Sequence, residues 1–215
     1  MKYYKFLNTE NKSTYQNKPW NLPTKNDDGT WTPGEWMPEI VGELELCKNG
    51  YHLTDAKNLL EWQEAQLYEA EYDGEILEGD SKVTVRRARL IRNVEGWNDR
   101  NLRLFAVWCA RQALALVENP DPRSIAACDV AERYANGDAT SDELYAARAA
   151  AWAAARDNVW DAAWAAATDN AWDAARAAAW AAARDAAWTS ARASATDTAW
   201  AAQYKKLWRM IGVKP

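Results

Sequence analysis

The sequence is poor in the residues on which most catalytic and metal sites depend. Its 215 residues contain one histidine, His52, and three scattered cysteines, Cys47, Cys109 and Cys128. One histidine excludes any site that needs two, and the cysteines have neither metal-ligand spacing nor the even number typical of a disulfide framework. The sequence also lacks a Gly-rich phosphate loop, a C-x-x-C motif and an H-E-x-x-H motif. We therefore expect reduced thiols, no metal and no cofactor.

Neither the charge nor the hydropathy pattern points to nucleic acid or to a membrane. A net charge of −5 and a pI near 5.1 give no reason to expect an anionic partner. Arg or Asp interrupts the alanine-rich tract every few residues, so no apolar run reaches the roughly 18 residues of a membrane span. The first residues, MKYYKFLNTENKS, lack the apolar core of a signal peptide. We expect a cytoplasmic protein.

The first 95 residues hold most of the glycine and proline and have the pattern of a β-rich domain with one helix. Turn signals occur at Asp28-Gly29 and Pro33-Gly34. The segments that predict strands are YYKFL, GELELC, GYHL, LYEAEY and KVTVRRARLI. Between GYHL and LYEAEY, the segment TDAKNLLEWQEAQ predicts a helix capped by Thr54 or Asp55.

From residue 96 onward the apolar residues follow helical spacing. The pattern predicts helices near 98–118, 122–136 and 141–210, the last of them open to a break. The first begins at an Asn98 cap, and the second begins at Asp121 with proline in its first turn. Thr140 and Glu143 form a T-x-x-E capping box for the third. The predicted fold class is α+β, with a β-rich domain over 1–95 and an Ala/Trp-rich helical domain with long helices over 96–215.

A four-residue repeat runs through the last predicted helix, which contains neither glycine nor proline. One column of the repeat alternates mainly between Trp and Arg, the next holds the acidic residues, and the other two are nearly all alanine. The tryptophans of this column are Trp152, Trp160, Trp164, Trp172, Trp180, Trp188, Trp200 and Trp208. Four residues advance an α-helix by about 400°, so the column drifts about 40° per repeat. We expect either a partner that wraps right-handed around the helix or a break, near 168–170 or 189–198. A long helix is the favoured alternative.

The tryptophan column has three explanations. The indoles can pack against alanine inside the helical domain, which is the interpretation we favour because eight regularly spaced indoles exceed what a small ligand site uses. They can form the interface of a homo-oligomer. They can also stack, together with the arginines of the same column, on an anionic or aromatic ligand.

Arg86, Arg87, Arg89 and Arg92 form the one local basic cluster, on a predicted strand. Alternation places Arg87 and Arg89 on one face and the other two on the opposite face. The cluster is either a site for phosphate or an acidic partner, or an ordinary charged strand.

The helical domain resembles a known family over about residues 97–208. The residues that carry the likeness are WNDRNLRLFAVWCARQALALV and ERYANGDATSDELYAARAAAW. The family consists of bacterial and phage Ala/Trp-rich helical proteins that are often labelled immunity proteins. The resemblance implies a non-enzymatic protein that binds and neutralises a partner.

A second resemblance concerns LCKNGYHLTDAKNLLEWQEAQLYEAEYDGEI, which is similar to the C-x-x-G-[FY]-H segment of a domain common in phage proteins. More distantly, it is similar to the strand–helix–strand part of ADP-ribosyltransferase-like folds. Gly50, Tyr51, His52 and Thr54 match the middle motif of those enzymes, whereas the first strand, YYKFL, carries neither their Arg nor their His. This resemblance implies a pocket for a nucleotide-like ligand.

We therefore expect a non-catalytic protein that sequesters a host or toxin protein, or a small nucleotide-like signal, in phage–host or toxin–immunity conflict. Its candidate ligand-binding residues are Tyr51, His52, Thr54, Arg86, Arg87 and Arg89, and its candidate interface is the tryptophan column. One alternative is an NAD-using ADP-ribosyltransferase that employs Tyr51 and His52 with an acidic residue. The other is a structural homo-oligomer assembled through the tryptophan column.

Overall fold

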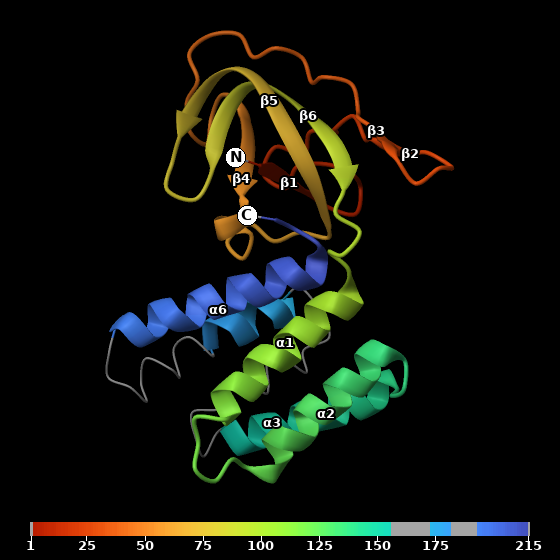
Figure 1. Cartoon of the computed structure of the whole chain (residues 1–215), viewed down its shortest axis with the longest axis vertical. Coiled ribbons are helices and arrows are strands. Elements are labelled where there is room, and N and C mark those ends of the chain that lie inside the picture. Colours follow the sequence, from red (N-terminus) through yellow and green to blue (C-terminus); the bar gives the residue numbers. More distant parts are fainter. Residues whose placement is uncertain (1, 156–172, 182–192, 215) are drawn as a thin grey trace. The chain divides into compact units, whose positions relative to one another are not determined.

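A computed structural model describes residues 2–155, 173–181 and 193–214, and it combines strands with helices, which confirms the α+β class (Figure 1). The chain forms two compact units. The first, which we name the barrel unit, comprises Met1–Trp97 and Ile211–Pro215, and the second, the helical unit, comprises Asn98–Met210. The division lies two residues after the boundary expected from the sequence.

Four antiparallel strands close into a small barrel in the order β1-β4-β6-β5. Their bounds are β1 (Tyr3–Leu7), β4 (Tyr51–Asp55), β5 (Gln66–Glu78) and β6 (Val83–Asn93). Each contains a segment predicted as a strand, and each is rich in the aromatic and β-branched residues that suit a half-buried pleated surface. The long β5–β6 hairpin shifts register between Asp73 and Ile76, where Gly74 adopts a φ of 81°. Such a bulge bends the hairpin, as barrel closure requires.

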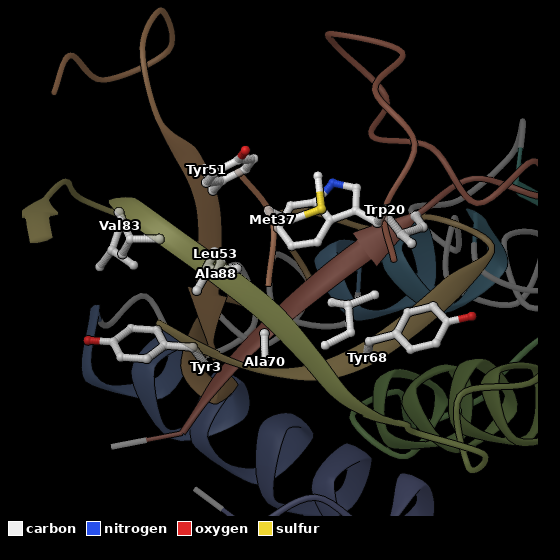
Figure 2. Close-up of a cluster of buried hydrophobic side chains, with 12 residues drawn as sticks. Tyr3, Trp20, Met37, Tyr51, Leu53, Tyr68, Ala70, Val83 and Ala88 are labelled. Carbon is white, nitrogen blue, oxygen red and sulfur yellow. The ribbon is translucent and has the colours of Figure 1, made fainter. Parts of the chain in front are cut away.

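Bulky side chains fill the interior of the barrel unit (Figure 2). Strand residues supply most of this cluster, and Trp20 and Met37 reach it from the long segment between β1 and β4. The Trp20 ring meets the Tyr51 ring edge-on at 5.4 Å between centroids. A four-stranded barrel has a narrow interior, so side chains alone are sufficient to fill it.

The segment between β1 and β4 also covers the part of β6 that β4 leaves unpaired. It carries a short hairpin of β2 (Thr24–Lys25) and β3 (Trp31–Thr32), and Gly29 makes the turn at a φ of 83°, as the Asp28-Gly29 signal predicted. Beyond β3, the amides of Gly34, Met37 and Ile40 donate to the carbonyls of Leu90, Ala88 and Arg86 at 2.9, 2.9 and 3.0 Å. Pairing of this kind protects a strand edge from other chains.

Two elements predicted in the barrel unit are wrong. GELELC is not a strand, because its one sheet-like contact is an isolated bridge between Glu45 and Asn49. TDAKNLLEWQEAQ holds a single 3-10 turn, Ala56–Asn58, capped by Asp55 as one of the two expected caps. Leu59 and Leu60 are both fully buried straight after this turn. Burial of adjacent residues overrides the helical propensity of the segment.

The helical unit contains α1 (Asp99–Leu114), α2 (Pro122–Asn136), α3 (Ser141–Ala155), a helical segment at 173–181 and α6 (Ala193–Ile211), the last residue of which belongs to the barrel unit. The predicted caps of α1, α2 and α3 are confirmed. The Asn98 side chain accepts from the Asn101 amide at 3.0 Å, and Asp121 accepts from the Arg123 amide at 2.8 Å. Thr140 and Glu143 each accept from the other's amide, which is the reciprocal pattern of a capping box.

Two neighbouring helical segments of the alanine-rich tract are not parts of one straight helix. The rings of Trp180 and Trp200 lie edge-on with centroids 5.1 Å apart. In one straight helix these residues would stand about 30 Å apart along the axis. The segment at 173–181 and α6 are therefore separate, so the single long helix favoured from the sequence is wrong here, and the alternative of a broken helix agrees with the structure. The expected break near 168–170, and most of the one near 189–198, lie outside the described residues.

No helix within the described ranges is long and apolar enough to cross a membrane.

In the barrel unit, Gly96 lies against the backbone of Ile211, where a Cβ on the glycine would stand 2.4 Å from the Ile211 carbonyl oxygen. Only glycine permits this approach.

Candidate functional site

The core of the helical unit combines alanine with a few larger apolar side chains, such as Leu102, Phe105 and Leu207, and two of its described tryptophans are exposed. Ala151 and Ala154 on α3 and Ala178 and Ala179 at 173–181 have no exposed surface. Next to them in sequence, Trp152 and Trp180 are 56% and 51% exposed. Alanine allows helices to approach closely, so the small columns face inward and the indoles face outward.

Four aromatic rings from two helical segments form a continuous row. Trp200, Tyr204 and Trp208 follow one another at four-residue spacing on α6, with ring centroids 6.1 and 5.9 Å apart. Trp180 adds its ring edge-on to Trp200. We name these four residues the aromatic row. The three residues on α6 are partly buried, because Gln203 and Leu207 form the adjacent buried face of that helix.

The aromatic row carries a local positive charge although the whole chain is acidic. Lys205 and Arg209 on α6 are exposed, and the Lys206 ammonium lies 5.9 Å from the ring centre of Trp108. Arg176, also exposed, precedes Trp180 by one helical turn and makes a loose 3.8 Å ion pair with Asp173. The exposed Trp180 and the partly exposed rings of α6, beside lysine and arginine, make a surface suited to an apolar, acidic partner.

Of the predicted tryptophan column, the structure describes half. Trp152, Trp180, Trp200 and Trp208 are on described helices. The remaining four, Trp160, Trp164, Trp172 and Trp188, lie outside the described residues.

In the barrel unit, two of the predicted ligand contacts are engaged within the fold. The Tyr51 hydroxyl donates to the Pro38 carbonyl at 2.7 Å. The Thr54 hydroxyl donates to the Ser81 carbonyl at 3.0 Å. Both side chains are buried, so their polar groups stabilise the barrel.

His52 is a neutral acceptor in its surroundings. Its Nε2 accepts from the Cys47 amide at 3.0 Å, so this nitrogen carries no proton. Desolvation, followed by the charges of Lys5 and Lys82, lowers the pKa of His52 to about 4. No carboxylate contributes to this shift.

The arginines of the basic cluster on β6 are engaged by other residues of the barrel unit, three of them by glutamates. Arg86 donates to the carbonyls of Ile40 and Gly42 at 2.7 and 2.9 Å and pairs with Glu75. Arg87 and Arg89 share a face, as predicted, and lie 5.1 and 4.7 Å from the Trp36 ring centre. Arg89 also pairs with Glu71, and Arg92 pairs with Glu69. These contacts hold loops and strands together.

A set of reactive side chains at β1, β4 and β6 was missed in the sequence. Lys5 lies between Tyr3 and Leu7 on the inward face of β1, donates to the His52 carbonyl at 3.1 Å and covers the Trp20 ring at 5.1 Å. Desolvation, with a contribution from Lys82, lowers its pKa to about 8. The alternation of β1 was the signal that could have found it.

Cys47 and Lys82 complete this set. Lys82 donates to the Cys47 sulfur at 3.0 Å, although the two residues are 35 positions apart in sequence. No sequence pattern links them. Within the described ranges, no group of three or more His, Cys, Asp or Glu residues could hold a metal ion.

Comparison of the chain with protein-family models, with curated proteins and with solved structures gives no match.

Proposed function

We propose that this chain is a non-catalytic binding protein that neutralises a partner protein by covering it with the aromatic row and Trp152. One observation carries the proposal: Trp152 and Trp180 are more than half exposed, although the residues next to them, Ala151 and Ala179, are fully buried. The likeness to immunity proteins supports a partner from phage–host or toxin–immunity conflict. The compartment we propose is the cytoplasm.

The energetics of indoles support a binding role over a purely structural one. Tryptophan has an apolar area of about 200 Å², and burying half of it in an interface is worth roughly 2–3 kcal/mol. Trp, Tyr and Arg are also the residues enriched at the centres of interfaces. The exposed halves of the Trp152 and Trp180 indoles add nothing comparable to the stability of the helical unit itself.

The charges beside the aromatic row support an acidic partner surface. Lys205, Lys206 and Arg209 lie on the same helix as three of its rings, and Asp197 is the single acidic residue of α6. Positive charge around an apolar centre accelerates association with acidic proteins. This electrostatic attraction weakens as the salt concentration rises. We therefore expect the affinity for the partner to fall with ionic strength.

The surroundings of His52 support the non-catalytic alternative. An ADP-ribosyltransferase of the expected type needs a carboxylate near its Tyr and His. The charged groups that act on His52 are two lysines, and the Tyr51 hydroxyl is engaged by the Pro38 carbonyl.

Site-specific photo-crosslinking tests the proposal. A benzophenone side chain replaces Trp180 in the full chain expressed in its host, and a matched chain carries it at Tyr15, which is 87% exposed in the barrel unit. We expect one heterologous protein to link at position 180 and not at position 15.

That protein, once purified, must then bind the wild-type chain at least tenfold more tightly than a Trp152→Ala/Trp180→Ala variant, while Tyr15→Ala binds normally. Links between copies of this chain would replace the proposal with the homo-oligomer. Equal binding by all variants would overturn it.

A further inference from the structure

Cys47 and Lys82 bring a thiol and a primary amine together from two segments of the barrel unit. Cys47 lies in the loop before β4 and is exposed, and Lys82 directly precedes β6. The Nζ–Sγ distance is 3.0 Å. Neither residue takes part in the function proposed above, which depends on the helical unit.

Each of the two groups is held in place by its own partners. The Cys47 amide donates to His52 Nε2 at 3.0 Å, and Cys47 keeps a left-handed φ of 67°, which a non-glycine residue rarely adopts. The Lys82 ammonium covers the Trp62 ring at 4.4 Å. That ring is itself fixed, because its Nε1 donates to the Ser81 carbonyl at 3.0 Å.

The loop and the β5–β6 turn are also packed together beside the pair. A Cβ on Gly79 would stand 3.1 Å from the nearest Leu46 methyl group and 3.1 Å from the Lys82 carbonyl oxygen. The Gly79 amide donates to that carbonyl at 2.9 Å. The short Nζ–Sγ distance is thus supported from both sides.

The pair differs from the other thiols and from the neighbouring amine. Cys109 and Cys128 are buried, and burial raises the pKa of both thiols, to about 12 for Cys128. A buried thiol with a raised pKa resists oxidation. Lys48, next to Cys47 in sequence, forms an ion pair with Glu45, whereas Lys82 contacts no carboxylate within the described part of the chain.

We propose that Cys47 and Lys82 form a redox-sensitive modification site, in which a peroxide converts them into a reversible sulfur–nitrogen cross-link. Hydrogen peroxide first oxidises the Cys47 thiol to a sulfenic acid and is itself reduced to one water. The neutral Lys82 amine then attacks the sulfur. The S–N bond forms as the S–O bond breaks, and the hydroxyl leaves with an amine proton as a second water.

The cross-link has two consequences for the barrel unit. It removes two hydrogen atoms from the protein and stops oxidation before the irreversible sulfinic acid. It also ties the loop before β4 to the start of β6. Two equivalents of a small thiol reverse it, because they restore the Cys47 thiol and the Lys82 amine and become a disulfide.

Mass spectrometry of the full chain, treated with equimolar hydrogen peroxide and then alkylated, tests this proposal. We expect the loss of two hydrogen atoms, one cross-linked peptide pair containing Cys47 and Lys82, and full recovery after dithiothreitol. Lys82→Arg keeps a cation over Trp62 without a primary amine, so its Cys47 should gain oxygen atoms instead. Lys48→Arg is the matched control and should link as the wild type does.

Three results would overturn the proposal. They are oxygen addition to Cys47 in wild type and Lys82→Arg alike, a link from Cys47 to Lys48 or to the backbone, and loss of hydrogen in Cys47→Ser. Circular dichroism of each variant checks that it is folded. The cross-linked peptide of the wild-type chain tests the proposal even if a variant does not fold. Binding through the aromatic row is measured separately, so either proposal can fail alone.

Discussion

The barrel unit and the alanine-rich helices of the helical unit place their tryptophans differently. In the barrel, Trp20 meets Tyr51 inside and is 7% exposed. On α3 and at 173–181, fully buried alanines form the inward face, and Trp152 and Trp180 are 56% and 51% exposed. The spacing of the elements explains this, because strands around a barrel leave room for an indole and helices that pack through alanine do not.

The largest effect we expect comes from removing an indole from the barrel. Trp20→Ala should lower the free energy of unfolding by about 3–5 kcal/mol, because it leaves a cavity between Tyr51 and the Lys5 side chain. Urea unfolding followed by circular dichroism measures the loss, and hydrogen exchange locates it in the barrel unit. A loss below 1 kcal/mol would mean that Trp20 does not belong to the core.

The second prediction concerns unfolding by acid. Among the described residues, the basic groups with a lowered pKa are Lys5 and His52, and both lie in the barrel unit. The pKa of His52 is about 4 when folded and 6.5 for the free side chain. The unfolded chain therefore takes up the proton first, and stability falls as the pH drops from about 6.5 to about 4. The wild type should lose up to about 3 kcal/mol in this range.

His52→Gln, which keeps an acceptor for the Cys47 amide, is the control for acid unfolding. Its stability should change less over the same range, as measured by urea titrations at each pH. Identical profiles for the two proteins would show that folding leaves the pKa of His52 unchanged, and they would contradict this prediction.

The third prediction concerns the enlargement of a buried alanine at a close helix contact of the helical unit. Ala151→Leu should cost about 1–3 kcal/mol, because the buried position has no space for three more carbons. Ala153→Leu on the same helix is the matched control, since Ala153 is exposed. Thermal unfolding of the two variants separates them, and equal melting temperatures would contradict an alanine core.

The smallest effect on stability should come from the exposed indole of α3. Trp152→Ala should lower the free energy of unfolding by about 1–2 kcal/mol, because less than half of the indole is covered in the folded unit. The same urea titration as for Trp20→Ala measures it. A loss above 2 kcal/mol would place Trp152 in the core and remove the contrast between the two units.

Local rules predicted much of this fold. Alternation found the segments of β1, β4, β5 and β6, and side-chain chemistry found the caps at Asn98, Asp121 and Thr140. These features depend on neighbours within a few residues of each other. The helix expected after Thr54 failed for the opposite reason, because long-range burial of Leu59 and Leu60 decided the local structure. GELELC alternates as a strand does, yet it makes only the isolated bridge between Glu45 and Asn49.

The sites were harder to predict than the fold. The repeat pointed to the tryptophan column, but its period could not tell which column of a short helix faces the core. In the sequence, Arg86 and Arg89 have the pattern of a binding cluster. In the structure, they are engaged by the Ile40 carbonyl and by Glu71, which come from other segments of the chain. Cys47 and Lys82 meet because β4 and β6 pair. The sequence of neither segment shows which distant strand it pairs with.

The contact between Gly96 and Ile211 makes the helical unit an insertion within the barrel unit. The chain leaves the barrel after Trp97 and re-enters it at Ile211, and these two points already touch through Gly96. A short glycine bridge could therefore replace residues 98–210 without moving a strand. The whole helical unit could thus be exchanged in one step, while the barrel keeps its strands and its Cys47–Lys82 pair.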